Sequence, residues 1–591
     1  MSVDAWVTLA VVVGVLALLV RGRVAPSLVL LGGAVAVLVL GVVTPQEAFS
    51  GFSNPAPVTV AALFVLAAAV EKTGALTPVM QRTLGDNGTY RRPLLRSLTP
   101  TMAASAFLNN TPVVAMLVMQ VSAWAERRDI APSKFLMPIS FAAIMGGLLT
   151  VIGTSTTLVV SSQMTTFGLE QLGFFEIAQV GLPIALVGLA VLVVMAPVVL
   201  PDRRSARAEV EEEGRRFSFE MQVVPGGPLD GKSVEQARLR RLEGLFLASV
   251  DRGDTVIAPV RPETVLRGDN RLHFVGPASR VVDLQDTPGL RSTELAHVLD
   301  LEEPAVRYFE AVVGQRSPLV GKTLKDVGFR SAYQAAVLAI HRSGQLVANR
   351  LGTERIRLGD TLIIVSDPGF RDRWRDRPDF LLVAELDGSP PVATSRAWVP
   401  VTLLAAVVVL AATGLVPILD GALVAAAVLL AAKVLTVTEA RRAIDFDVIL
   451  VIASAFGLAA AMESSGLAEI IAGGLVEVAG ALGPYGVLLG LVLATIVLTE
   501  LITNNAAALL MLPIAVNAAA AGGVDPRGAA VAVAVAASAS FLSPIGYQTN
   551  MMVYGPGGYQ FTDYARLGWM LTLLVIVATV ALVPVFWPAV G

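Results

Sequence analysis

The sequence predicts a polytopic α-helical membrane protein built as an inverted repeat, with re-entrant hairpins and broken helices, and with two small α+β domains inserted between the halves. Three observations predict this fold. Hydrophobic residues make up 54% of the chain and charged residues only 15%, and the apolar residues gather in runs near the ~20 residues that span a bilayer as a helix. Most of the charge lies between positions 201 and 395. The two flanking segments match each other in sequence.

The first membrane half, residues 1–200, is expected to contain six hydrophobic segments. The first of them has no basic region before it and no small-residue cleavage site after it, and more segments follow, so it is expected to be a span and not a cleaved signal peptide. The segments are 5–20, 25–43, 56–71, a broken segment at 97–127, a segment at 133–165 interrupted at Gly153, and 176–200.

The second membrane half, residues 397–591, repeats the first. Glu47, Glu71 and Gly74 pair with Glu439, Glu463 and Gly466 at a constant offset of 392 positions. Further on, residues 105–110 align with 499–504, and residues 152–156 align with 545–549. These matches indicate an internal duplication of one membrane unit.

Basic residues predict opposite orientations for the two halves, because the positive-inside rule places basic loops in the cytoplasm. Residues 44–55 contain no Lys or Arg, whereas the matching segment 436–447 contains Arg441 and Arg442. We therefore expect the N-terminus outside the cell membrane, the insert in the cytoplasm, and an inverted repeat of the kind that many secondary transporters use. The other basic residues behind this prediction are Arg21, Arg23, Lys72, Arg82, Arg91, Arg92, Arg96, Arg203, Arg204 and Arg207.

The insert is itself duplicated, with predicted domains at 215–290 and 303–385. Residues 228–233 match 318–323, and Gly268-Asp269 matches Gly359-Asp360. Apolar, β-branched runs at 245–250 and 361–365 predict strands around a helix-like stretch, so an α+β fold is expected for each domain.

The segment Gly226 to Ser233 satisfies the phosphate-loop pattern G-x-x-x-x-G-K-[ST], with a strand-like run before it and a helix-like run after it. The second copy keeps Gly321-Lys322-Thr323 but has Arg316 in place of the first glycine. Each domain is also too small for the parallel sheet of a phosphate-loop fold. We interpret the pattern as a turn into a helix, and we expect no enzyme.

Polar breaks interrupt the spans at four places. Asn109-Asn110-Thr111, followed by Pro112, corresponds to Thr503-Asn504-Asn505, and residues 153–157 correspond to 546–550. Amide side chains in hydrocarbon are costly without a partner or ligand, and amide, hydroxyl and carbonyl oxygens suit a small hard cation such as sodium. The alternative is that these groups only form interhelical hydrogen bonds.

The breaks contain neither Lys nor Arg, so an anion there would be held by hydroxyls, amides, helix dipoles and bound cations. Cation coupling would then be required electrostatically. Glu71 and Glu463 lie at the ends of spans and are expected to be structural, while Glu500 is expected to brace the second hairpin.

At these motifs the sequence resembles the divalent anion/sodium symporter family of the ion transporter superfamily. That family carries Ser-Asn-Thr at two hairpin tips, and its second hairpin typically reads Thr-Glu-Phe-Thr-Ser-Asn-Thr, where this chain has Thr499 to Asn505. Asn109 replaces the first Ser, and Thr503 and Asn505 replace the second Ser and Thr. The resemblance covers nearly all of the membrane part. The insert resembles two RCK C-terminal (TrkA-C) domains.

The resemblance implies a homodimeric, elevator-type secondary transporter in the lipid bilayer that couples Na+ to a small divalent anion, sulfate first and a dicarboxylate second. It also implies a small cytosolic effector on the RCK-like pair, no covalent cofactor and no nucleic acid partner. Two alternatives stay open. An RCK-regulated cation channel should carry a filter such as Thr-Val-Gly-Tyr-Gly, and a sodium/proton antiporter should carry a carboxylate pair in the breaks.

The same resemblance implies which residues form the sites. The expected cation-binding residues, with sodium as the metal, are Asn109, Asn110, Thr111, Gly153, Thr154, Thr503, Asn504, Asn505 and Gly546. The expected substrate-binding residues are Asn110, Thr111, Ser155, Thr156, Asn504, Asn505, Gln548 and Thr549.

Overall fold

The structure is a computed structural model that describes most of residues 1–588. The residues it leaves out within that range are 22–23, 85–89, 127, 129, 204–217, 238, 240–245, 254, 259, 276–287, 293–306, 315–316, 343–344, 348–353, 375–376, 378 and 386–395. Several features predicted above lie outside the described residues. They are Arg23, Arg204, Arg207, Arg316 and the starts of the two inserted domains at 215 and 303.

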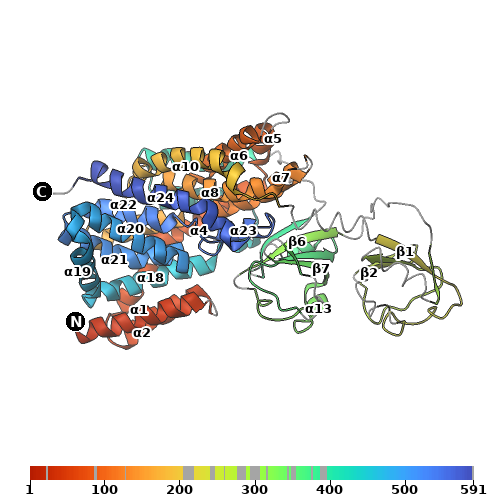
Figure 1. The fold of residues 1–591 in the computed structure, drawn as a ribbon. Helices are drawn as coiled ribbons and strands as arrows, with labels where there is room; N and C mark the ends of the chain where they lie inside the picture. Colours follow the sequence, from red (N-terminus) through yellow and green to blue (C-terminus); the bar gives the residue numbers. More distant parts are fainter. Residues whose placement is uncertain are drawn as a thin grey trace.

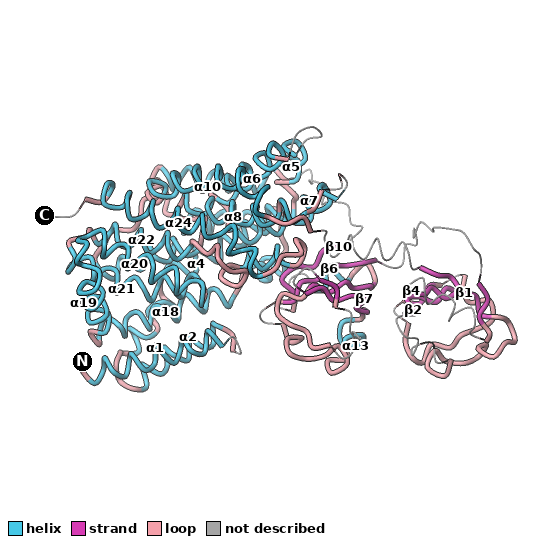
Figure 2. Tube along the Cα trace, in the orientation of Figure 1, coloured by secondary structure: helices cyan, strands magenta, loops and turns pink. Residues whose placement is uncertain are grey.

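The two ends of the chain form one helical body, and the insert forms two small sheets beside it (Figures 1 and 2). Among the described residues, eight helices are long and apolar enough to cross a membrane. Four shorter apolar helices accompany them. The chain is therefore a multi-pass helical membrane protein, as predicted.

In the first half, each predicted segment forms helix, and both predicted breaks are present. Helix α6 ends at Ser105 and α7 begins at Asn110, while α8 ends at Gly146 and α9 begins at Ser155. The helices are α1 (Val3–Arg21), α2 (Pro26–Val39), α3 (Pro45–Ala48), α4 (Pro55–Lys72), α5 (Thr77–Leu84), α6 (Arg91–Ser105), α7 (Asn110–Glu126), α8 (Leu136–Gly146), α9 (Ser155–Met164) and α10 (Ala178–Val199).

The second half has the same order of helices. Its breaks lie between Leu501 and Asn504 and between Ser538 and Gln548. The helices are α15 (Trp398–Ala412), α16 (Ile418–Ala431), α17 (Val437–Ala443), α18 (Phe446–Ser464), α19 (Leu467–Ala479), α20 (Gly483–Leu501), α21 (Asn504–Gly522), α22 (Pro526–Ser538), α23 (Gln548–Tyr554) and α24 (Phe561–Phe586).

Matching positions of the halves have matching local structure. Thr44 and Glu47 form a capping box at the start of α3, and Thr436 and Glu439 form the same box at the start of α17. The halves also contact each other reciprocally: α2 packs on α18 while α16 packs on α4, and α9 packs on α21 while α23 packs on α7. Equivalent helices of the two halves therefore make equivalent contacts across the boundary between the halves.

Two glycines in corresponding helices allow a close approach to backbone carbonyls of other segments. A Cβ atom on Gly181 of α10 would lie 2.1 Å from the carbonyl oxygen of Leu148, and one on Gly568 of α24 would lie 2.0 Å from that of Phe541. Any larger residue would displace backbone at either place. The equivalence of α10 and α24 therefore extends to individual positions.

The insert consists of two five-stranded antiparallel sheets. The first has the order β3-β2-β4-β1-β5 and the second the order β10-β6-β9-β7-β8. The strands predicted at 245–250 and 361–365 are confirmed as β2 and β9. The strands are β1 (Ser218–Val223), β2 (Phe246–Asp251), β3 (Val256–Ile257), β4 (Arg271–Val275), β5 (Leu290–Ser292), β6 (Arg307–Val313), β7 (Ala335–Arg342), β8 (Gln345–Leu346), β9 (Thr361–Ser366) and β10 (Phe380–Glu385).

The helix predicted directly after Ser233 is wrong, because residues 234–237 form turns. The phosphate-loop pattern also folds on itself: the carboxylate of Asp230 accepts hydrogen bonds from the backbone N–H of Gly226 at 2.8 Å and of Gly268 at 2.9 Å. These two donors lower the pKa of Asp230. One loop amide that a phosphate would need, that of Gly226, is therefore occupied by a carboxylate of the chain.

Candidate functional site

The four polar breaks meet at one cavity of about 830 Å³. Most of the predicted site residues line it, and Asn110, Thr154 and Thr549 are buried around it. Gly153 lies against Gly147 and Ser105, close enough that a Cβ atom would be 3.0 Å from the Ser105 carbonyl oxygen. The predicted residues that line the cavity are Asn109, Thr111, Ser155, Thr156, Thr503, Asn504, Asn505, Gly546 and Gln548.

Two helices that begin at this cavity are capped by polar side chains. Asn109 accepts from the N–H of Thr111 at 3.3 Å at the start of α7, and Thr154 accepts from the N–H of Thr156 at 3.0 Å at the start of α9. Helix α21 begins at Asn504 on the other side. Helix N-termini carry a partial positive charge and free N–H groups, so this arrangement favours an anion between them.

Asn110 lies at the centre of a fully buried polar cluster. One end of its amide lies 3.1 Å from the carbonyl oxygen of Ala143 and 3.3 Å from that of Gly153, and it also contacts the hydroxyl of Ser105. The other end lies 2.7 Å from the hydroxyl of Tyr547. With the amide nitrogen turned inward, the protein alone satisfies the cluster.

With the amide oxygen turned inward, the cluster contains four oxygens and needs a cation. The ligands would be the side chains of Asn110 and Ser105 and the carbonyls of Ala143 and Gly153. The Tyr547 hydroxyl can donate to the amide oxygen or accept from the amide nitrogen, so it serves both orientations. Oxygen ligands of this type fit sodium, and they hold it without any carboxylate.

The second half has a corresponding cluster around Asn504. The hydroxyl of Thr499, which matches Ser105, lies 3.0 Å from the amide oxygen of Asn504 and 2.6 Å from the carbonyl oxygen of Ala537. One hydroxyl hydrogen serves two acceptors there. The hydroxyl oxygen of Thr503 is buried without a hydrogen-bond partner. A cation bound among these amide, hydroxyl and carbonyl oxygens would give the Thr503 hydroxyl oxygen a partner.

Reciprocal hydrogen bonds join the two clusters across the cavity. The Thr111 hydroxyl donates to Gln548 at 3.2 Å, and the hydroxyls of Ser155 and Thr156 each donate to Asn505 at 3.2 Å. Thr111 and Asn505 are equivalent positions of the two halves, as are Ser155 and Gln548. Residues of both halves thus form one site.

Glu500, which is expected from the sequence to brace the second hairpin, ties the end of α20 to the break between α22 and α23. Its carboxylate accepts from the N–H of Leu542 at 3.0 Å and from the hydroxyl of Ser543 at 2.7 Å. The Ser543 hydroxyl accepts in turn from the N–H of Gly546 at 3.1 Å. In the first half, Thr150 holds Gly153 in the same way and donates to the carbonyl of Ala106. The Glu500 carboxylate therefore accepts the hydroxyl hydrogen bond that the Ala106 carbonyl accepts in the first half.

The sequence interpretation missed several residues of the site. Tyr547 reaches Asn110 of the other half, and the hydroxyl of Ser140 donates to Asn550 at 2.7 Å and to Thr549 at 2.9 Å. Tyr547 occupies the position that Thr154 has in the first half. The repeat alignment marks that position, but it contains no information on how far the tyrosine ring extends.

Charged residues lie around the cavity away from the breaks. Glu71, Lys72, Glu439 and Arg442 line it, and Lys72 pairs with Glu439 at 2.7 Å. Glu463, in contrast, accepts from Asn517 at 3.1 Å. Among the described residues there is no group of three His, Cys, Asp or Glu that could hold a metal ion. A cation in this cavity would be held by amide, hydroxyl and carbonyl oxygens.

A multi-pass protein with paired helix breaks around one polar cavity has the architecture of a secondary transporter. A family model described as citrate transporter (CitMHS) matches residues 16–536, so the chain belongs to that family. It is a transporter and not an enzyme.

Three relatives align over most of their length. The uncharacterized transporter sll0640 of Synechocystis sp. is 34% identical, over 98% of this chain and 96% of its own. The uncharacterized transporter YfbS of Escherichia coli is 29% identical, over 99% of both chains. Sodium/sulfate cotransporter 1 of Chlamydomonas reinhardtii is 26% identical, over 89% of this chain and 83% of its own.

Proposed function

We propose that this protein is a sodium-coupled secondary transporter of a small divalent anion, with sulfate as the first substrate and dicarboxylates second. One observation carries the proposal: two equivalent acceptor-rich clusters, around Asn110 and Asn504, flank a cavity at which helix N-termini meet. Homology to a sodium/sulfate cotransporter supports the choice of ions. A local match to SdcS, a sodium-dependent dicarboxylate transporter of Staphylococcus saprophyticus, supports the second substrate, with 29% identity over 24% of this chain and 28% of its own.

In this proposal the cations bind first and complete the anion site. Asn109, Asn110, Thr111, Gly153 and Thr154 hold one sodium ion, and Thr503, Asn504, Asn505 and Gly546 hold the other. In the first of these sites the Asn110 and Gly153 oxygens are joined by those of Ser105 and Ala143, while Asn109 and Thr154 cap the helices beside it. Since the breaks contain no basic residue, two sodium charges and the helix N-termini balance the two charges of the anion. Hydroxyls and amides then orient it, from Asn110, Thr111, Ser155, Thr156, Asn504, Asn505, Gln548 and Thr549.

We further propose an inverted repeat with the N-terminus outside and the insert in the cytoplasm. Residues 1–200 and 397–591 are the two repeats, and residues 215–290 and 303–385 are RCK-like domains that bind a small effector. The reciprocal helix contacts support the twofold relation, and the basic residues of 436–447 support the inversion. An elevator motion within a homodimer completes the proposal.

Uptake into proteoliposomes tests the function. We expect labelled sulfate to accumulate above equilibrium with an inward sodium gradient, and to equilibrate slowly without one. Labelled succinate, measured in parallel, determines which class of anion the cavity prefers. Accumulation that does not depend on sodium, or unitary currents in a planar bilayer, would refute coupled transport.

Cysteine labelling tests the orientation, since the native chain has no cysteine. The segment 44–55 should face outward, but Gly51 itself is unsuitable because a Cβ atom there would lie 2.2 Å from the carbonyl oxygen of Ala453. Ser53 is exposed and replaces it. We expect Ser53→Cys, and not Arg441→Cys, to react with an impermeant reagent applied to intact cells. Equal reactivity of the two would rule out the inversion.

A further inference from the structure

We infer that the second inserted sheet, β6 to β10, is part of the transport pathway and acts as the gate of the cavity on the side of the insert. This inference rests on the proposed function. The wall of the cavity contains Phe380, Leu381, Leu382 and Val383 of β10, together with Gly314 after β6. These insert residues line the same space as Asn504 and Gln548.

The position of β10 in its sheet makes this contact available. Strand β10 is an edge strand, paired on one side with β6 only. In Figure 1 the second sheet lies next to α23, whereas the first sheet lies farther from the helices. An unpaired sheet edge is normally protected by charge or by a covering element. Here the helical body covers it.

A β-bulge directs two successive side chains of β10 toward the helices. The register with β6 shifts between Phe380 and Leu382. Phe380 and Val383 pack in the core of the second sheet, whereas Leu381 and Leu382 pack with the core of the helical body. In a regular strand the alternation would have placed Leu381 and Leu382 on opposite faces. The bulge therefore builds an apolar contact surface.

The C-terminal end of α23 is in direct contact with this sheet. A Cβ atom on Gly555 would lie 1.8 Å from the hydroxyl oxygen of Thr361 in β9, and one on Gly359 would lie 3.3 Å from the ring of Tyr554. Val312 of β6 belongs to the core of the helical body. The N-terminal end of α23 supplies Gln548 and Thr549 to the site. One short helix thus connects the site with the sheet.

Comparison of the two inserted sheets shows that this surface is specific to the second. The strand registers make Val312, Thr361 and Leu382 equivalent to positions of the first sheet that are polar or charged. Those positions are occupied by Gln222, Arg271 and Arg291, and the bulged Leu381 has no counterpart there. The sister sheet has the same strand order and a core of its own. An ordinary solvated sheet edge would not need three apolar or small replacements at the contact.

The geometry has a consequence for transport. An anion in the cavity can leave toward the insert only when β10 separates from α23, because Leu381 and Leu382 close that wall. Since α23 carries site residues at its other end, movement of the site and release of the sheet are mechanically linked. A ligand that binds the insert acts on transport through its differential affinity for the docked and released sheet.

A disulfide between the sheet and α23 tests the gate. The double variant Thr361→Cys/Gly555→Cys places the two Cβ atoms about 3.2 Å apart, close to the spacing of a natural disulfide. We expect sodium-driven sulfate uptake to fall to the level of empty liposomes after oxidation and to recover after reduction. Thr361→Cys alone, treated with the same oxidant, is the control. Undiminished uptake by a fully cross-linked sample would overturn the inference.

A second experiment opens the gate instead of locking it. Leu382→Arg introduces the residue that the sister sheet has at this position, and Ala115→Cys provides a reporter in the cavity wall. We expect a maleimide to label Ala115→Cys several-fold faster in the purified protein when the sister residue is present. An unchanged labelling rate, in a variant that elutes as native protein, contradicts the gate. Loss of uptake by the unmodified protein would instead refute the proposed function.

Discussion

Two equivalent ion pairs tie the membrane halves together, and the arginines of the two pairs come from different parts of the chain. In one, Arg527 at the start of α22 binds Glu176 with Nε to Oε1 at 2.6 Å. In the other, Arg203 binds Asp563 with Nη1 to Oδ2 at 2.7 Å. Glu176 and Asp563 correspond, since each precedes by five positions the glycine that packs tightly in α10 or α24. The position equivalent to Arg527 in the first half is a serine.

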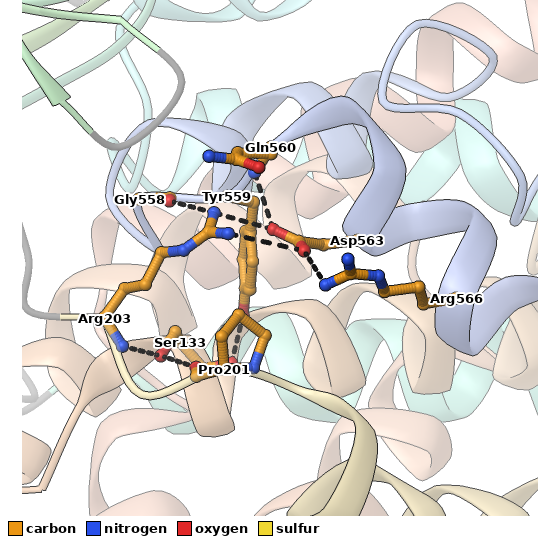
Figure 3. A network of polar contacts seen from close by, with 8 residues as sticks. All are labelled: Ser133, Pro201, Arg203, Gly558, Tyr559, Gln560, Asp563 and Arg566. Carbon is orange, nitrogen blue, oxygen red and sulfur yellow. Dashed lines mark hydrogen bonds and ion pairs between the residues drawn. The ribbon is translucent and has the colours of Figure 1, made fainter.

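That serine, Ser133, forms a hydrogen bond with Arg203, which supplies the arginine of the second ion pair (Figure 3). Its hydroxyl accepts from the N–H of Arg203 at 3.0 Å, and its carbonyl accepts from the hydroxyl of Tyr559 at 2.5 Å. Arg203 also donates to the carbonyl of Gly558 at 2.8 Å. Arg203 is the last described residue before the insert. One pair takes its arginine from a membrane helix of the second half, and the other takes it from the connection to the insert.

The largest expected effect concerns stability, and it separates the two pairs. The Asp563 side chain is 0% exposed and that of Glu176 is 16% exposed. Removing one partner of a buried pair leaves an uncompensated charge, which costs about 3–5 kcal/mol. We expect Arg203→Ala to be destabilised near the lower end of that range, because Arg566 lies 3.4 Å from Asp563 and compensates in part. Arg527→Ala should lose less.

Thermal unfolding in detergent measures both variants. Arg203→Ala/Asp563→Asn should recover most of the loss, since no buried charge is left unpaired. Arg566→Ala is the control, because its side chain is 60% exposed. Equal losses of stability in Arg203→Ala and Arg527→Ala would mean that burial does not distinguish the two ion pairs.

The next effect is on coupling. Asn110→Ala and Asn504→Ala each remove an amide oxygen from an acceptor-rich cluster, at a cost of about 1–3 kcal/mol in cation binding. We expect both variants to lose sodium-coupled uptake while remaining folded. Asn517→Ala removes an amide that binds Glu463, and it should transport normally. Normal sodium dependence in either site variant would remove that cluster from the proposed function.

Tyr547 distinguishes the two cation clusters, because its counterpart Thr154 is too short to reach across. Tyr547→Phe removes the hydroxyl that lies 2.7 Å from the Asn110 amide. The loss of one hydrogen bond is worth about 1 kcal/mol, or roughly fivefold in affinity. We expect one phase of sodium activation to shift to higher concentration and the other to stay. Tyr485→Phe, at an exposed position, is the control, and a shift of both phases would contradict the assignment.

The smallest effect concerns the two capping boxes. Burial raises the pKa of Glu439, but hydrogen bonds from Lys72 and Thr436 lower it by more, and the resulting pKa is about 2. Glu47 has the same box without a lysine, because Lys72 is replaced by Ser464 in the other half. Since the pair is partly exposed, Glu439→Gln should cost only about 0.5 kcal/mol.

The sign of the pH dependence follows from the lowered pKa. A carboxyl whose pKa is lower in the folded state stabilises the protein above its ordinary value of 4.5, and this contribution is lost as pH falls toward 2. The difference in melting temperature between the native protein and Glu439→Gln should therefore shrink as pH falls from 6 to 3. A difference that grows over this interval would be inconsistent with the ion pair.

The sequence predicts the parts of the molecule that depend on local composition. Hydropathy locates the helices, and the polar breaks locate Asn110, Asn504 and the brace Glu500. It does not predict contacts that depend on side-chain reach or strand register. The reach of Tyr547 and the placement of Leu381 and Leu382 on one face of a bulged strand are examples. The helix expected directly after Ser233 is absent because residues 234–237 form turns.

The separation of paired residues along the chain also determines how long the first residue of a pair waits for the second during synthesis. Asp563 follows Arg203 by 360 positions, and Asn505 follows Ser155 by 350. At a synthesis rate of about 5–20 residues per second, the ribosome needs roughly 20–70 s to complete the partner of Arg203. During that interval the polar breaks of the first half lie in the membrane without their partners. Assembly of this protein therefore requires that the polar groups of the first-half breaks have other hydrogen-bond partners until the second half has been synthesised.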